Sequence, residues 1–338
     1  MPSPANADPI LVVGSVALDT ITTAHGRADK VLGGSASYFS LVASAFAPVR
    51  LVAVVGDDFP ADYRALLSAR RIALDGLVVS PGRTFHWEGI YEADLVGRRS
   101  LKTELNVFEA FRPEIPGPFQ DSPIVFLANI DPELQASVLD QMKEPRWVVL
   151  DTMDFWMTGD KREALLRLLP RVHVVLVDHG EARLLTGESH LSRAARWIQE
   201  RGPRVVVVKR GDSGALARID GTWFWVPPYP EAAVIDPTGA GDSFAAGFLG
   251  AVAGWGLDAA GIRRGLLMGA ASASFVIERF GAQSLAEFDP AEIVRRARII
   301  RDMGSMERPD PVLDEEVPEE AGSSRGGTSG GSGKGRAH

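Results

Sequence analysis

Cysteine is absent from this sequence of 338 residues. Its absence excludes disulfide frameworks, thiolate metal sites and cysteine nucleophiles together. A chain without cysteine suits a reducing compartment, and we expect a cytoplasmic location.

The sequence also lacks an excess of basic residues and a long apolar run. Its net charge is −8 and 24% of its residues are charged, which indicates neither a nucleic acid nor an anionic membrane as a partner. No segment approaches the roughly 18 apolar residues that a membrane span needs. The first residues, MPSPANADPILVVGS, lack a basic segment followed by an apolar stretch, so no signal peptide is predicted. We expect a soluble, mildly acidic globular protein.

Apolar, β-branched runs alternate with helical patterns along most of the chain. The runs lie at 10–15, 49–56, 123–129, 146–152, 171–178 and 203–211. They are apolar almost throughout, which is typical of strands with both faces covered. Helices are expected at 60–70, 132–142, 160–169 and 191–201, and after Gly239 at 244–253, 259–277 and 291–301. This order predicts a doubly wound, mostly parallel α/β sheet flanked by helices.

Two segments depart from this alternation. Residues 84–106 are polar and aromatic by turns, with a hairpin expected near 96–97, and they indicate half-exposed strands that form a lid. A surface hairpin without a catalytic part is the alternative. From Arg308 onward, proline, acidic residues, glycine and serine cannot bury enough surface to offset the entropy of ordering. We predict one domain over residues 1–305 and a disordered tail over 306–338.

The segment DPTGAGDSFAAGFLG at 236–250 places glycines and a carboxylate directly before an apolar helix. A helix N-terminus attracts anions, and glycines let its backbone approach a bulky anion closely. Asp242 has two interpretations: a helix-capping or first-turn acid, or a general base beside an anion cradle. The helix is apolar on nearly every face and should be buried, which favours an N-terminus that opens into an interior cleft.

Residues 236–244, with the AAGFL that follows, resemble the C-terminal signature of the PfkB or ribokinase-like carbohydrate kinases, and the likeness extends over about residues 9–302. The resemblance implies phosphoryl transfer from ATP to a hydroxymethyl group of a sugar or sugar-like substrate. It implies that Asp242 is the catalytic base and that the amides of Gly239, Ala240 and Gly241 form an anion hole. The implied fold has a small β-sheet lid, with elements at about 16–33 and 84–108.

Asp178 and Glu181 follow the strand expected at 171–177 and are candidates to hold Mg²⁺ through water. The alternative is a capping box, in which Asp178 caps a short helix and Glu181 supports it. The family usually has Asn-x-x-Glu here, so Glu181 carries over better than Asp178.

Nucleotide contacts are implied by the resemblance in the turn VVVVKRGDSGALA. Lys209, Gly211 and Gly214 are therefore candidate ATP-site residues, whereas a plain hairpin with basic residues at its mouth is the alternative. Gly281, in a later segment, is expected to border the adenine. The chain has no GxxxxGK[ST] motif, so a different glycine-rich turn must cradle the phosphates. The resemblance also implies a monovalent-cation site, with Asp236 and Ser284 as its candidate ligands and K⁺ as the candidate ion.

The N-terminal third is expected to bind the acceptor. Asp19 resembles the family aspartate that accepts hydrogen bonds from substrate hydroxyls. Gly33 and Gly34 lead into a helix, as in the family. Tyr38 stands where the family has asparagine, and Asn106 on the lid side is a candidate to replace part of that contact.

The sequence therefore predicts an ATP- and Mg²⁺-dependent kinase that phosphorylates a primary hydroxyl of a sugar or small polyol. The alternatives are a nucleoside kinase of the same family, in which Tyr38 or a lid aromatic stacks on a base, and a non-catalytic sensor of sugars or nucleotides. An exposed lid edge would allow a homodimer.

Overall fold

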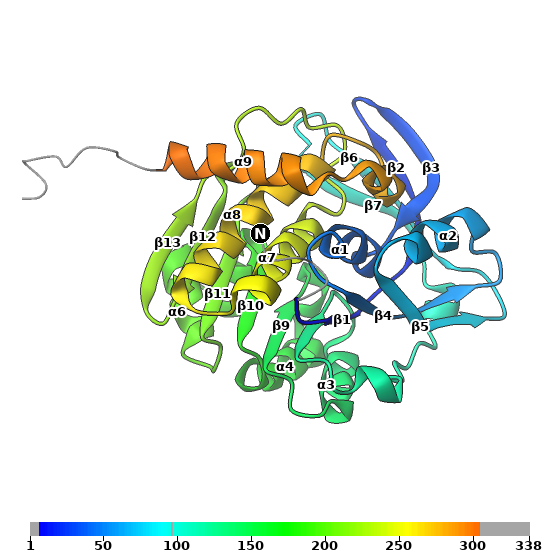
Figure 1. The fold of residues 1–338 in the computed structure, drawn as a ribbon, viewed down its shortest axis with the longest axis horizontal. Helices are drawn as coiled ribbons and strands as arrows, with labels where there is room; N and C mark the ends of the chain where they lie inside the picture. The colour runs from blue at the N-terminus through cyan, green and yellow to red at the C-terminus, as the bar shows by residue number, and fades with distance from the viewer. Residues whose placement is uncertain (1–6, 96, 305–338) are drawn as a thin grey trace, which may run out of the picture. The chain divides into compact units, whose positions relative to one another are not determined.

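Two β-sheets and the helices around them make up the part of the chain that the computed structural model describes, residues 7–95 and 97–304 (Figure 1). The larger sheet has nine strands in the order β13-β12-β11-β10-β9-β8-β1-β4-β5. The strands are β1 (Ile10–Val13), β4 (Val49–Gly56), β5 (Ile72–Ser80), β8 (Ile124–Leu127), β9 (Trp147–Asp151), β10 (Val174–Asp178), β11 (Val205–Lys209), β12 (Ala215–Ile219) and β13 (Thr222–Val226). Neighbours are parallel except for the antiparallel pairs β11–β12 and β12–β13, which confirms the mostly parallel sheet.

Helices cover both faces of the larger sheet. Their bounds are α1 (Ser35–Ala43), α2 (Ala61–Ala69), α3 (Pro132–Gln141), α4 (Gly159–Leu168), α5 (His179–Thr186), α6 (Leu191–Gln199), α7 (Ala240–Trp255), α8 (Ala259–Val276) and α9 (Pro290–Met303). One hydrophobic core lies between the sheet and the group of α1, α7, α8 and α9, and the other lies between the sheet and α3 to α6.

Alternate residues of each central strand belong to opposite cores. In β1, Ile10 and Val12 pack into the core of α1, α7 and α8, whereas Leu11 and Val13 pack into the core of α3 to α6. The valines of β11 alternate in the same way. Because both faces of the sheet are covered, every strand position needs an apolar side chain, and this requirement explains the continuous apolar runs in the sequence.

Helix α7 is buried along most of its length, with every residue from Ser243 to Ala253 buried. It packs against α1 and α8, where small residues allow a close approach. A Cβ at Gly247 would lie 2.5 Å from the carbonyl oxygen of Met268, so a larger residue would push the two helices apart. The helix begins at Ala240 rather than at the predicted residue 244, because Gly239 adopts the left-handed conformation and turns the chain into the helix one turn earlier.

The smaller sheet has four strands in the order β3-β2-β6-β7, which Figure 1 shows together at the upper right. They are β2 (Ala17–Thr23), β3 (Gly26–Gly33), β6 (Phe85–Tyr91) and β7 (Arg98–Glu104). β2 and β6 are parallel, and the two outer pairs are antiparallel. β6 and β7 form the expected hairpin, in which the amide of Glu92 donates to the carbonyl oxygen of Gly97 at 2.9 Å. Val96 and the predicted tail lie outside the described residues.

Two strand predictions need correction. β10 begins at Val174 and not at residue 171, because Leu169–Arg171 forms a 3₁₀ turn around Pro170. β5 was not anticipated, because Asp75 and Gly76 interrupt its apolar run and its last two valines are exposed at the edge of the sheet.

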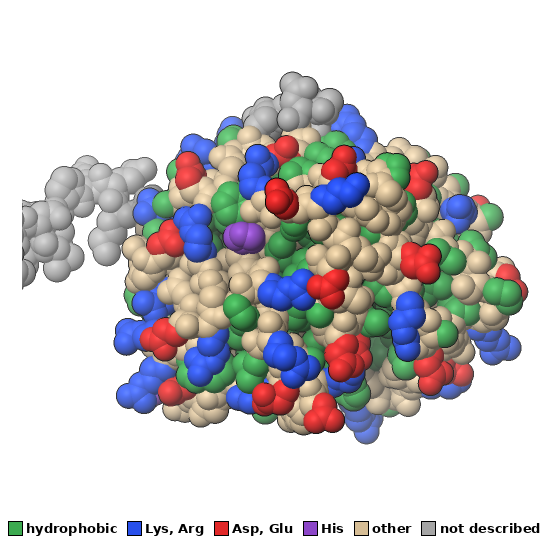
Figure 2. Space-filling model, turned by 90° about the horizontal axis from the view of Figure 1, so that it is seen from below, with side chains coloured by type: hydrophobic (Ala, Val, Ile, Leu, Met, Phe, Trp, Pro, Cys, Tyr) green, Lys and Arg blue, Asp and Glu red, His purple; other side chains and the backbone are tan. Residues whose placement is uncertain are grey.

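The surface carries charges of both signs. On the face shown in Figure 2, acidic and basic side chains are interspersed with apolar ones, and neither sign gathers into a large patch. Among the helices of residues 7–95 and 97–304, none combines the length and the apolar character that a membrane span requires.

The aromatic pair between α1 and β8 provides a test of the core. Phe126 is fully buried and stacks on Phe39 with ring centroids 4.2 Å apart. We expect Phe126→Ala to lower the free energy of unfolding by about 3–5 kcal/mol, since truncation leaves a cavity between sheet and helix. Phe155→Ala, at a side chain that is 68% exposed, is the matched control and should change it by about 0.5 kcal/mol or less. Urea denaturation followed by circular dichroism measures both, and equal losses would contradict this account.

Candidate active site

The carboxyl ends of three adjacent parallel strands bring charged side chains together. β9 ends at Asp151, β10 at Asp178 and β11 at Lys209. Asp178 and Lys209 are register partners, and the Lys209 ammonium donates to the Oδ1 atom of Asp151 at 2.9 Å. Open α/β sheets bind ligands outside this edge, so the fold places a candidate site here.

The N-terminal turn of α7 meets the same edge of the sheet. Its N-cap residue is Gly239, and Asp242 lies in its first turn. Gly241 faces Lys209, because a Cβ at Gly241 would lie 3.1 Å from the lysine Nζ. Gly239 has no side chain to cap the helix. The amide of Ala240 donates to the Pro237 carbonyl oxygen at 3.2 Å, and the positive end of the helix dipole at this turn favours an anion. Asp242 is thus a first-turn acid and not the N-cap.

The surroundings of Asp242 change its acidity. Burial raises its pKa to about 7, and the negative charge of Asp151 contributes to the rise. The positive charges of Lys209 and Arg98 act in the opposite direction. A carboxyl group that titrates near neutral pH can both accept and release a proton there, as a general base must.

Tyr38 lies directly against this turn. Its ring touches Gly239 so closely that any Cβ at that position would overlap it. The side chain is 1% exposed, and within residues 7–95 and 97–304 its hydroxyl group has no hydrogen-bond partner. Burial raises the pKa of Tyr38 well above its usual value, and the charges of Asp236 and Asp19 add to this effect. The ring is packed in the protein and is not free to stack on a nucleobase.

The predicted acceptor residues Asp19, Gly33 and Gly34 lie together. A Cβ at Gly33 would overlap the Asp19 carboxylate, and Gly34 is the N-cap of α1. Burial raises the pKa of Asp19 to about 7, although a hydrogen bond from the Gly34 backbone lowers it. The negative charges of Asp236 and Asp242 also raise the pKa of Asp19. The ionisation of Asp19 is therefore coupled to that of the carboxylates at the α7 turn.

Asn106 does not join this group. Its Nδ2 atom donates to the carbonyl oxygen of Thr84 at 3.0 Å, which ties it to the backbone of the β6 segment. In the described part of the chain, it makes no hydrogen bond to Asp19 or Tyr38.

Asp178 and Glu181 form the capping box of α5. The Asp178 carboxylate accepts from the Glu181 amide at 2.7 Å, and the Glu181 carboxylate accepts from the Asp178 amide at 2.8 Å. Burial raises the pKa of Glu181 well above its usual value, while Lys209 lowers it. Within residues 7–95 and 97–304, no cluster of three or more His, Cys, Asp or Glu side chains has the arrangement of a direct metal site. The oxygen donors at this edge fit a Mg²⁺ ion that keeps its water shell.

The predicted ATP-site residues Lys209, Gly211 and Gly214 do not all face the same way. Gly211 begins a 3₁₀ turn after β11, and the amide of Arg210 donates to the carbonyl oxygen of Gly214 at 2.8 Å to close it. A Cβ at Gly214 would overlap the Val226 carbonyl oxygen of β13. Lys209 points away from this turn, toward Asp151 and Gly241.

Asp236, Gly281 and Ser284 are close to one another. Asp236 is fully buried and accepts hydrogen bonds from the amides of Thr238 at 2.9 Å and Gly281 at 3.4 Å. The Ser284 hydroxyl donates to the Gly281 carbonyl oxygen at 2.7 Å. The two segments that the sequence assigned to a cation site are therefore adjacent.

Sequence reasoning missed several residues of this region. Asp151 was visible as a carboxylate at the end of an apolar strand, the same signal that identified Asp178. Arg98 and Tyr91 come from the lid, where the pattern gave no signal. The Tyr91 hydroxyl lies 3.0 Å from the Thr238 hydroxyl and connects the lid to the segment before α7.

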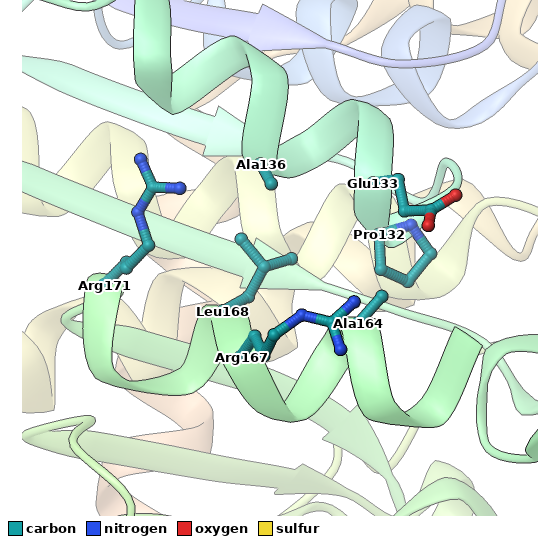
Figure 3. A pocket seen from close by; sticks show the side chains of 7 residues that line it. All are labelled: Pro132, Glu133, Ala136, Ala164, Arg167, Leu168 and Arg171. Carbon is teal, nitrogen blue, oxygen red and sulfur yellow. The ribbon is translucent and has the colours of Figure 1, made fainter. Parts of the chain in front are cut away.

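A surface hollow of about 200 Å³ lies elsewhere, between the outer helices α3 and α4 (Figure 3). Its lining includes Glu133, Arg167, Leu168 and Arg171, and no predicted site residue belongs to it. Glu133 pairs with Lys161, and Arg171 pairs with Asp140, so these charges already have partners.

The family model of the pfkB family carbohydrate kinases matches residues 7–288. The chain belongs to this family. A Thermococcus kodakarensis cytidine kinase is 34% identical over 246 residues, which are 71% of this chain and 87% of that protein. A Zea mays inositol 3-kinase is 31% identical over 272 residues, 74% of this chain and 67% of that protein. This PfkB-family enzyme is accordingly a sugar or nucleoside kinase.

Solved structures of the same fold support the architecture. A Methanocaldococcus jannaschii nucleoside kinase of the ribokinase family has a TM-score of 0.71 at 23% identity, covering 87% of this chain and 99% of that one. An Escherichia coli protein described as a ribokinase II, in complex with ATP and Mg²⁺, has a TM-score of 0.71 at 19% identity, covering 86% and 99%. A Vibrio cholerae fructokinase with bound fructose, ADP and potassium has a TM-score of 0.73 at 19% identity, covering 86% and 98%.

The raised pKa of Asp242 predicts a pH-dependent effect on stability. Its pKa is about 7 in the folded protein against a reference value of 3.8. Between these values the folded state binds more protons than the unfolded state, so the free energy of unfolding falls as the pH rises. Asparagine cannot ionise. At pH 8 we therefore expect the free energy of unfolding of Asp242→Asn to exceed that of the parent by at least about 1 kcal/mol. The gain should disappear as the pH falls toward 4, as measured by urea denaturation.

Asp121 is the control for this measurement, because Arg50 pairs with it at 2.7 Å and lowers its pKa. Asp121→Asn should give no gain at pH 8. The account of Asp242 fails if the two variants respond alike across this pH range.

Proposed function

We propose that this kinase transfers the γ-phosphoryl group of ATP to a primary hydroxyl of a small sugar, polyol or nucleoside, with Asp242 as general base. The observation that carries the proposal is the position of Asp242 in the first turn of a buried helix whose N-terminus, after Gly239, has no side-chain cap. A base and an anion cradle within one turn supply what phosphoryl transfer needs from a protein, which is positioning and charge stabilisation.

Different residues bind the acceptor and the phosphoryl group in this proposal. Asp19 accepts hydrogen bonds from acceptor hydroxyls and turns the reacting hydroxyl toward Asp242, which removes its proton. The amides of Gly239, Ala240 and Gly241 receive the oxygens of the transferring group. Each such donor is typically worth about 2.7–4 kcal/mol in a transition state, and a general base contributes roughly 10²–10⁴-fold.

Glu181 and Asp178 hold Mg²⁺ through water in this proposal, and the ion would neutralise charge on the ATP phosphates. Their carboxylates lie at the strand edge near Lys209, and the E. coli neighbour that contains ATP and Mg²⁺ supports the use of these two ligands. Asp236 and Ser284 are proposed to bind a monovalent cation, and the potassium-bound fructokinase supports the presence of such an ion in this fold. Gly211, Gly214 and Gly281 border the nucleotide.

A nucleoside acceptor is the second candidate, and the similarity to cytidine kinase favours it. Its 5′-hydroxyl is also a primary alcohol, so the chemistry at Asp242 is the same. The buried ring of Tyr38 cannot provide the base stack, which leaves the partly exposed lid aromatics Phe85 and Trp87 for that contact.

We expect Asp242→Asn to reduce kcat by at least about 10²-fold while the affinity for ATP stays within a few-fold, since the amide cannot accept the proton. Steady-state kinetics and calorimetric nucleotide titration measure the two effects. Asp121→Asn, on the surface, should leave both unchanged. Turnover of Asp242→Asn near that of the parent would remove Asp242 as the base.

The acceptor class is decided by ADP release over a panel of sugars, polyols and nucleosides. A small polyol or hexose should show the highest kcat/KM if the acceptor is a sugar, and cytidine or another nucleoside if the second candidate holds. ADP release above the ATP-only background is expected with at least one compound. Binding without turnover across the whole panel would favour a sensor.

A further inference from the structure

A buried ion pair crosses the carboxyl edge of the sheet. Lys209 ends β11, Asp151 ends β9, and the strand between them is β10. The two side chains are 17% and 4% exposed, and their charged atoms are 2.9 Å apart. A buried ion pair is a poor source of stability, because desolvation of the two charges offsets their attraction. Its place in the candidate site points to a role in the reaction.

The ammonium of Lys209 lies against the turn that begins α7. A Cβ at Gly241 would be 3.1 Å from Nζ, so the ammonium lies in tight contact with this turn. A lysine ammonium has three donors, and in the described part of the chain Asp151 is the hydrogen-bond acceptor for one of them. The other donors are beside the amides that receive the phosphoryl oxygens in the proposed function.

The charge balance at this position also calls for a cation. Asp151, Glu181 and Asp242 all act on Lys209. Burial by itself would lower the pKa of Lys209, but Asp151 and Glu181 outweigh it and hold the pKa above its usual value. The ammonium therefore stays charged. A helix N-terminus supplies only about half an elementary charge, too little to offset these carboxylates when a phosphoryl group arrives.

We propose that Lys209 is a catalytic residue that donates hydrogen bonds to the transferring phosphoryl group, and that Asp151 is the positioning residue that aims it. This inference rests on the proposed function and gives Lys209 a more specific role than nucleotide contact. The acceptor oxygen forms a bond to the γ-phosphorus, and the bond to the bridging oxygen breaks. That oxygen leaves with the electron pair on ADP, and the hydroxyl proton passes to Asp242. Lys209 keeps its proton throughout and stabilises the equatorial oxygens.

The absence of cysteine from the chain permits a direct test of the charge. Lys209→Cys can be alkylated at its single thiol with 2-bromoethylamine, which rebuilds a lysine-like ammonium, or with iodoacetamide, which adds a neutral amide. Mass spectrometry reports the extent of each modification. We expect the unmodified variant and the carbamidomethyl form to lose at least about 10²-fold in kcat, with the acceptor KM within about threefold. Aminoethylation should raise kcat at least tenfold above that of the unmodified Lys209→Cys variant.

Equal activity of the two alkylated forms, or kcat of Lys209→Met within threefold of the parent, would overturn the inference. Thermal melting of each variant shows whether a loss of activity reflects unfolding, and the comparison between the two alkylated forms holds even if both are less stable. A parent enzyme that releases no ADP with any acceptor contradicts the proposed function itself, which is a distinct result.

The pH profile tests the part of Asp151. The charged or titratable groups that act on Asp242 are Asp151, Lys209 and Arg98, and Asp242 in turn acts on Asp19 and Tyr38. Asp151 raises the pKa of Asp242 and Lys209 lowers it. The acidic limb of kcat/KM should therefore move to lower pH in Asp151→Asn and to higher pH in Lys209→Met. If the acidic limb moves in the same direction in both variants, or does not move, the inference that Asp151 positions Lys209 for the reaction is wrong.

Discussion

The buried course of α7 is the constraint on which the site depends. Its side chains are covered from Ser243 to Ala253, so packing against α1 and α8 fixes its direction. Its N-terminus consequently opens at the carboxyl edge of the sheet, and the first amides cannot shift without disturbing a close-packed interface. In this kinase, the packing that forms the core also fixes the position of the proposed anion hole.

The same burial sets the electrostatics. Asp19, Asp242 and Glu181 all have raised pKa values, in each case mainly because they are removed from water. A site that collects carboxylates and must also receive a polyphosphate needs positive charge at the point of transfer. Lys209 from the sheet and Arg98 from the lid are the positive charges that act on Asp242. Closing the lid would therefore change the charge at the base as well as exclude water.

The sequence predicts the fold well because the sheet is covered on both faces. Each central strand therefore needs apolar residues at successive positions and is visible in the sequence as a continuous apolar run. It predicts the α7 turn well because glycines and a carboxylate before an apolar helix leave few structural alternatives. The Lys209–Asp151 pair could not be predicted, since it joins strands that are adjacent only through β10 and lie 58 positions apart in the sequence. The capping box at Asp178 was weighed correctly as an alternative, because spacing alone cannot tell a cap from a ligand. The sequence likewise could not show that the Asn106 amide donates to the nearby Thr84 carbonyl oxygen.

Tyr38 shows how the two halves of the site constrain each other. The ring lies under Gly239, and the hydroxyl lies among Asp19, Asp236 and Asp242. A smaller residue at this position would leave a cavity beneath the α7 turn, and a residue with a Cβ at 239 would displace the ring. The wall of the proposed acceptor site would thus also support the proposed anion hole. Any change of acceptor preference made through residue 38 must therefore preserve the position of that turn.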